Sequence, residues 1–99
     1  MVILKNPVHP GEILKIEFMD ELGLSSGALA KAIHVPRTRI ERLIKLQVGV
    51  TPDTALRLSK CLNTSAEFWL NLQKNYDLSL ARQNQKLAQE LDAILSLAS

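Results

Sequence analysis

Apolar residues recur along the chain at the spacing of three to four residues that marks amphipathic helices, and no stretch alternates apolar and polar residues as a half-buried strand would. The first such stretch predicts a helix over residues 10–22, which closes on Gly23, a residue that favours helix ends. Ser25 is a good N-cap for a second helix over 26–33. The pattern therefore predicts an all-α protein. The residues at helical spacing in the first helix are Ile13, Leu14, Glu17, Phe18 and Leu22.

The same pattern continues with three more helices and an amphipathic tail. Pro36 suits the first turn of a helix over 36–45, because its missing amide proton would have no partner there. Thr51 and Ser65 are N-caps for a fourth and a fifth helix. The residues expected on the buried faces of these two helices are Ala55, Leu56, Leu58, Ser59 and Leu62, then Phe68, Trp69, Leu72 and Tyr76. The tail is marked by Leu87, Leu91, Ile94, Leu95 and Ala98. Residues 1–82 are thus predicted to form one five-helix domain, and residues 83–99 an amphipathic helical tail.

The second and third helices have the spacing of a helix-turn-helix, in which the second helix of the pair enters the major groove of DNA. Ala30 is small, as the close crossing of the two helices requires. His34 occupies the turn position that glycine usually takes in the left-handed conformation, which histidine tolerates better than most residues. The apolar residues that would pack the pair onto its neighbours are Ile33, Val35, Ile40 and Leu43.

Charge is distributed unevenly along the chain, although its net value is only +2. Residues 1–30 hold two basic and four acidic side chains, residues 31–60 hold seven and two, and residues 61–99 hold three and four. A basic block inside a folded region is typical of a surface that binds a polyanion, although many such blocks are only solvated surface. A helix bundle that never contacts DNA is the alternative interpretation at this point.

The solvent face of the third helix is the candidate DNA-binding surface. It comprises Arg37, Thr38, Arg39, Glu41, Arg42 and Lys45, together with Ser26 at the start of the second helix. Arginine can donate two hydrogen bonds to a guanine edge, and threonine can offer a hydroxyl or a methyl group to a base. Lysine and arginine neutralise phosphates, so DNA affinity should fall with salt.

Several longer motifs resemble the HigA-type antitoxins, also known as virulence-associated protein I, within the phage-repressor-like helix-turn-helix group. The similarity covers residues 8–82. Its motifs are VHPGEIL at 8–14, GLS at 23–25, ALA at 28–30, TP at 51–52 with ALRL at 55–58, TSAEFWLNLQ at 64–73, and YD at 76–77.

This resemblance implies a homodimer that binds a palindromic double-stranded DNA operator, represses its own operon and neutralises a HigB-type toxin that cleaves messenger RNA on the ribosome. By the same resemblance, Arg37 and Thr38 read bases, while Ser26 and Lys45 hold phosphates. Two positions depart from the pattern, since Ser26 stands where glutamine is common and Lys45-Leu46 replaces a usual Asn-Gly. A stand-alone transcription regulator without a toxin is the alternative function.

Other classes of protein lack support in the sequence. His9, His34 and Cys61 are not spaced as metal ligands, and no set of side chains forms a catalytic constellation, so we expect no metal, no cofactor and no enzyme activity. We expect Cys61 to be a core thiol and His9 to cap or pack at the start of the first helix. No apolar run approaches the length of a membrane span, which predicts a cytoplasmic protein.

Overall fold

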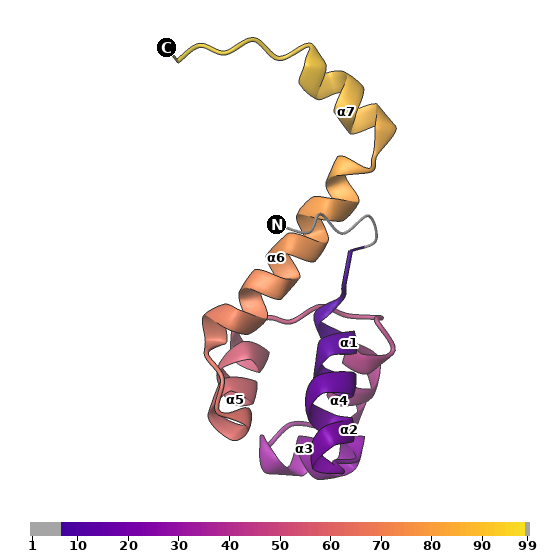
Figure 1. The fold of residues 1–99 in the computed structure, drawn as a ribbon, viewed down its shortest axis with the longest axis vertical. Coiled ribbons are helices and arrows are strands. Elements are labelled where there is room, and N and C mark those ends of the chain that lie inside the picture. Colours follow the sequence, from indigo (N-terminus) through magenta and orange to yellow (C-terminus); the bar gives the residue numbers. More distant parts are fainter. Residues whose placement is uncertain (1–6, 99) are drawn as a thin grey trace.

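The computed structural model describes residues 7–98, and every regular element among them is helical (Figure 1). The elements are α1 (Pro10–Ile13), the π-helical η1 (Leu14–Met19), α2 (Asp20–Leu22), α3 (Ser26–Ala32), α4 (Arg37–Ile44), α5 (Pro52–Leu62), α6 (Ala66–Arg82) and α7 (Gln85–Asp92). The predicted all-α class is confirmed, as is the order of the helices. Within this part of the chain, no helix is long and apolar enough to cross a membrane.

The first predicted helix is present over 10–22, but its middle turn is π-helical. A π turn places residues five apart, rather than four, on one face. Leu14 and Met19 are accordingly both buried, whereas Leu22 is exposed. Leu22 therefore does not continue the buried face, although its spacing in the sequence is helical, because the period of 3.6 residues does not hold through η1.

Three of the helices begin at a side-chain cap that the sequence predicts. Ser25, Thr51 and Ser65 each accept a hydrogen bond from the backbone amide three residues on, at 3.1, 3.3 and 3.0 Å. These caps satisfy amides that have no partner inside the helix. α4 differs, because Pro36 is extended and lies outside the helix, which begins at Arg37 and not at the predicted residue 36.

Four helix ends share one capping motif of the backbone. A residue one or two positions beyond each helical segment is left-handed, at Gly23 (φ 66°), His34 (φ 60°), Leu46 (φ 63°) and Asn63 (φ 54°). The next amide then returns to a carbonyl five residues back, at 2.8, 3.0, 2.9 and 3.1 Å respectively, which is the Schellman arrangement. The left-handed conformation expected at His34 is confirmed, and Leu46 adopts it in place of the usual glycine.

The core lies where α1, η1, α3, α4, α5 and the first half of α6 meet. Its largest fully buried side chains are Leu14, Leu29, Ile40, Leu43, Leu58 and Trp69. The expected burial of Phe68 in α6 was wrong, because its side chain is 37% exposed. Two expectations about α5 were also wrong, since Leu56 is 62% exposed and Cys61 is exposed. Ala55 and Leu58 already occupy the face of α5 that meets the core, so these two side chains lie on its other faces.

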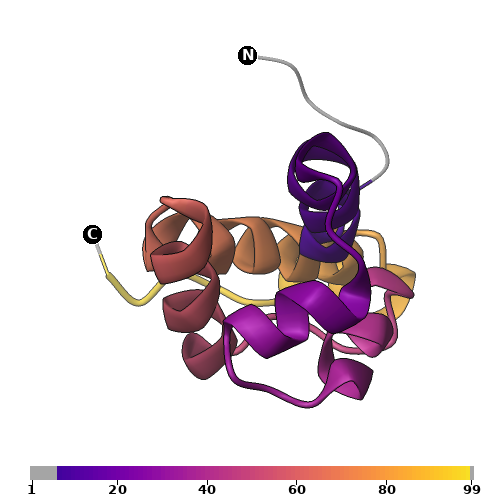
Figure 2. The same cartoon turned by 90° about the horizontal axis from the view of Figure 1, so that it is seen from below.

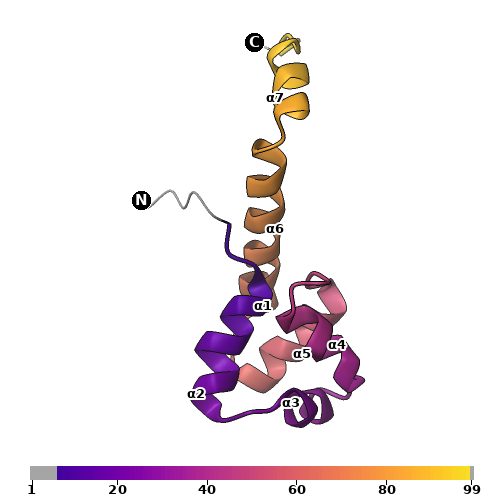
Figure 3. The ribbon, with the colours of Figure 1, turned by 90° about the vertical axis from the view of Figure 1, so that its right-hand side faces the viewer.

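The molecule consists of a globular part and a projection (Figures 1 and 3). We call residues 7–76 the head and residues 77–98 the arm. The arm comprises the end of α6, α7 and a non-helical tail, and no buried residue lies beyond Trp69 in the described chain. The predicted tail helix is shorter than expected, because it ends at Asp92 and leaves Ile94 and Leu95 outside it.

Candidate nucleic-acid interface

The predicted helix-turn-helix is formed by α3 and α4, which pack against each other at the end of the head seen in Figure 2. Ala30 is buried, as a close crossing requires, and so are Ile33, Ile40 and Leu43. Val35 is partly buried against the same core. The apolar set proposed from spacing is therefore the set that packs this unit onto the head.

The candidate DNA-binding residues lie on α4, except for Ser26 at the start of α3 and Lys45 at the C-cap of α4. Arg37, Thr38, Arg42 and Lys45 are exposed, whereas Ser26, Arg39 and Glu41 are partly buried. The Arg37 guanidinium, with its side chain 70% exposed, forms an ion pair of 3.3 Å with Glu41 one turn on. This pair lies in solvent, so it can orient Arg37 but contributes little to stability.

Arg39 is held by another helix. Its Nη1 donates to Asp53 Oδ2 at 2.6 Å, and Asp53 lies in the first turn of α5. The hydrogen bond from Arg39, followed by the one from Arg57, holds the pKa of the Asp53 carboxyl below its usual value. Arg39 is therefore less available to a phosphate than the sequence alone suggested.

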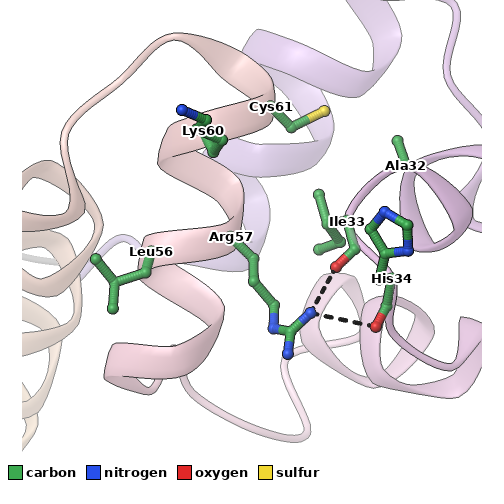
Figure 4. A pocket seen from close by; sticks show the side chains of 7 residues that line it. All are labelled: Ala32, Ile33, His34, Leu56, Arg57, Lys60 and Cys61. Carbon is green, nitrogen blue, oxygen red and sulfur yellow. Dashed lines mark hydrogen bonds between the residues drawn. The ribbon is translucent and has the colours of Figure 1, made fainter.

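Arg57 contacts the turn of the helix-turn-helix, a role that the sequence did not reveal (Figure 4). Its Nη1 donates to the carbonyls of Ile33 and His34, at 2.9 and 3.2 Å, and its Nε donates to Asp53 at 3.0 Å. The spacing of Asp53 and Arg57, four residues apart on one helix, was a visible signal for their ion pair. No sequence signal pointed to the two carbonyls, which lie 24 and 23 residues away.

A groove of about 440 Å³ lies beside Arg57. Its other lining residues are Ala32, Ile33, His34, Leu56, Lys60 and Cys61, which come from α3, the turn and α5 (Figure 4). Within residues 7–98, no three His, Cys, Asp or Glu side chains lie close enough together to hold a metal ion.

His9 acts at the start of the first helix, as expected. Its Nδ1 accepts a hydrogen bond of 2.9 Å from the amide of Gly11, and its ring packs edge-on against Tyr76 of α6 at 4.8 Å between centroids. Burial lowers the pKa of His9 below its ordinary value, and the nearby carboxylates of Glu12 and Asp77 oppose this shift. His9 thus joins the first helix to α6.

Together, a helix-turn-helix with an exposed basic second helix defines a DNA-binding protein of the helix-turn-helix class. The comparison with known families agrees, because residues 16–69 match the helix-turn-helix family model.

More specific relatives extend this result. The chain is 45% identical to virulence-associated protein I of Dichelobacter nodosus, over 93% of this chain and 82% of the relative. It is 42% identical to antitoxin HigA-1 of Vibrio cholerae serotype O1, over 75% and 70%. The structure matches that of antitoxin GraA in complex with its operator with a TM-score of 0.87 and 41% identity, covering 100% of this chain and 99% of the other. The chain belongs to the HigA-type antitoxin family of helix-turn-helix proteins.

Proposed function

We propose that this chain is a sequence-specific DNA-binding antitoxin of a type II toxin-antitoxin system, which represses its own operon and neutralises an mRNA-cleaving toxin. The observation that carries the proposal is the exposed basic face of α4 in a chain of the HigA-type family. Its structural relative GraA, solved with its operator, supports the DNA-binding half. The relative named antitoxin HigA-1 supports the antitoxin half.

In this proposal, Arg37 and Thr38 read base edges in the major groove, because they lie in the first turn of α4, where recognition helices meet the bases. Glu41 holds Arg37 through their ion pair and can itself accept from a cytosine amino group. The residues assigned to the phosphates are Ser26, Arg39, Arg42 and Lys45, and Arg39 would use the guanidinium N–H groups that Asp53 leaves free.

We further propose that the protein acts as a homodimer on a palindromic operator. Two copies of α4 must enter successive major grooves on one face of the duplex, so the half-sites should lie about 34 Å apart. Residues 1–82 would form the DNA-binding domain, and α6 together with residues 83–99 would contribute to the contact between copies. The apolar side chains that the arm leaves exposed support this assignment, namely Leu78, Leu80, Leu91, Ile94 and Leu95. Light scattering at micromolar concentration tests it, and a monomer would contradict it.

The toxin partner in this proposal is a HigB-type ribosome-dependent mRNA interferase, and it binds a surface remote from α4. The test is an Arg37→Ala, Thr38→Ala double variant in a cell that carries the operon. Each lost base contact is worth about 1–3 kcal/mol per half-site, so repression should be lost while protection from the toxin remains. Lys74→Ala, which removes an exposed lysine from α6, is the control for repression and should retain it.

Either of two results would contradict part of the proposal. Full repression by the double variant would show that α4 is not the reader. Failure of the unaltered protein to protect cells from a toxin encoded beside it would favour the alternative, a stand-alone transcription regulator.

A further inference from the structure

The helix-turn-helix turn is held by a side chain that lies outside the motif. We propose that Arg57 is a positioning residue for DNA recognition, because it binds the carbonyls of Ile33 and His34 and, through Asp53, the side chain of Arg39. These bonds fix the orientation of α4 relative to α3 and α5. The inference depends on the proposed function, in which α4 reads the operator.

Arg57 supplies a protein donor to both carbonyls. The Ile33 carbonyl belongs to the C-cap of α3, where peptide carbonyls have no partner within the helix, and the His34 carbonyl follows it in the turn. Within residues 7–98, no backbone amide donates to either of them. A guanidinium is a fitting donor, because it is always charged and presents several N–H groups in a rigid plane.

The backbone of the turn is strained, so a bond that restrains it affects the position of α4. His34 has a φ of 60°, which costs energy for any residue other than glycine, so the turn between α3 and α4 is held in a sparsely populated conformation. A bond to the His34 carbonyl restrains the rotation of the peptide that leads into α4. Loss of that bond would therefore change where Arg37 and Thr38 lie relative to the bases.

Asp53 carries the same restraint into α4. Its Oδ2 accepts from Arg57 of its own helix and from Arg39 of α4. The Asp53 side chain is 55% exposed and both arginine side chains are 39% exposed, so these ion pairs contribute little to stability. This network links the turn, α4 and α5 but adds little to the free energy of unfolding. Its main effect is therefore on the orientation of α4. Base recognition depends on that geometry more strongly than phosphate contact does.

The experiment uses the full-length Arg57→Met variant, which keeps an unbranched apolar side chain but removes the donors. Its affinity is measured for a duplex from the promoter of its own operon and for a scrambled duplex of the same length, at one salt concentration. We expect the promoter affinity to fall by about ten-fold or more, and the scrambled affinity by less than about three-fold. Lys60→Met is the matched control, because Lys60 lines the same groove one turn on, and it should preserve the ratio of the two affinities.

Two further variants keep the proposal testable if Arg57→Met does not fold. Asp53→Asn leaves the carbonyl bonds of Arg57 in place and should reduce the affinity ratio by about two- to four-fold. Arg57→Lys retains the charge but loses the planar set of donors. The ratio of promoter affinity to scrambled-duplex affinity should therefore be lower in this variant than in the unaltered protein.

The proposal is overturned by an unchanged ratio in a folded Arg57→Met variant, or by an unchanged ratio in Asp53→Asn where Arg57→Met is unfolded. An equal loss on both duplexes also overturns it, because that result would make Arg57 a general DNA contact. Failure of the proposed function has a different signature, namely an Arg37→Ala, Thr38→Ala variant that binds the promoter duplex as well as the unaltered protein does.

Discussion

The head and the arm are both helical and both rich in apolar residues, but only the head buries them. In the head, Leu14, Leu58 and Trp69 are completely buried, whereas in the arm Leu91 is 51% and Leu95 is 82% exposed. An amphipathic helix gains most of its stability by burying its apolar face against another element. The head provides such elements within one chain, and the arm does not.

This difference separates the folding of one copy from the assembly of two copies. The head has what a single copy needs to fold and to present α4, while the exposed apolar side chains of the arm form the kind of surface that marks contact with another molecule. If the arm binds a second copy, changes in the head should act on folding and changes in the arm should act on assembly. Four measurements test that separation.

The largest effect is expected from Trp69→Ala in the head. Trp69 is fully buried, packs against Phe18 and Phe68, and donates from Nε1 to the Thr64 hydroxyl at 2.7 Å. Its truncation should lower the free energy of unfolding by about 3–5 kcal/mol, as urea denaturation followed by circular dichroism would report. Leu95→Ala is the counterpart in the arm and should cost under about 0.5 kcal/mol in a monomer. Equal losses from the two changes would show that head and arm do not differ in this way.

The next effect concerns assembly. Leu91→Glu places a charge on the apolar face of α7, and burial of a leucine contributes about 1.5–3 kcal/mol. Because a two-fold dimer carries the change in both copies, its dissociation constant should rise by about one hundred-fold or more, as measured by sedimentation equilibrium. Gln89→Glu introduces the same charge from an exposed polar position of α7 and should leave the dimer intact. Unchanged dimerisation of Leu91→Glu would remove this face of α7 from the interface.

A smaller effect is expected where the head carries backbone strain. Leu46 is left-handed at the end of α4, a conformation that costs a residue with a Cβ about 1–2 kcal/mol. Leu46→Gly should stabilise the protein by about 0.5–1 kcal/mol, because the greater entropy of glycine in the unfolded chain offsets part of the relief. Asn63→Gly is the control and should change stability by less, since asparagine tolerates this conformation. A destabilised Leu46→Gly variant would mean that contacts of the leucine side chain outweigh the strain.

The smallest effect is a pH dependence at the junction of the first helix and α6. Burial lowers the pKa of His9, so the unfolded chain takes up a proton near the ordinary value of 6.5 while the folded protein does not. Stability should be constant above that value and fall as the pH drops from it to the lower pKa of the folded protein. Melting temperatures at about pH 7.5 and about pH 5.5 measure this loss. His9→Asn keeps an N-cap acceptor but does not titrate, so its stability should vary less over this range. Stability that rises on acidification would contradict the assignment.

Much of the head could be predicted from the sequence because its helix ends are local. The hydroxyls of Ser25, Thr51 and Ser65 each bond an amide only three residues away, so the cap is visible in the residues themselves. The left-handed turn at His34 was predictable for the same reason, because the motif demands it at a fixed position. On the candidate interface, the exposure of Arg37, Thr38, Arg42 and Lys45 followed from the spacing of the apolar residues between them, and their contact with DNA stays a prediction.

Only the tertiary structure decided which helix faces meet. Leu56 and Cys61 were expected in the core but lie outside it, because Ala55 and Leu58 fill the contact between α5 and the core. The π turn of η1 moved Leu22 out of the apolar stripe, and the periodicity of one segment does not record such a change in period.

The structure also decided two contacts between distant residues. Arg39 donates to Asp53, 14 positions away, and Arg57 donates to the carbonyl of Ile33, 24 positions away. A helix cap closes within one turn and is determined by neighbouring residues. A bond between helices exists only after the whole head has packed, so the sequence of either helix alone does not contain it.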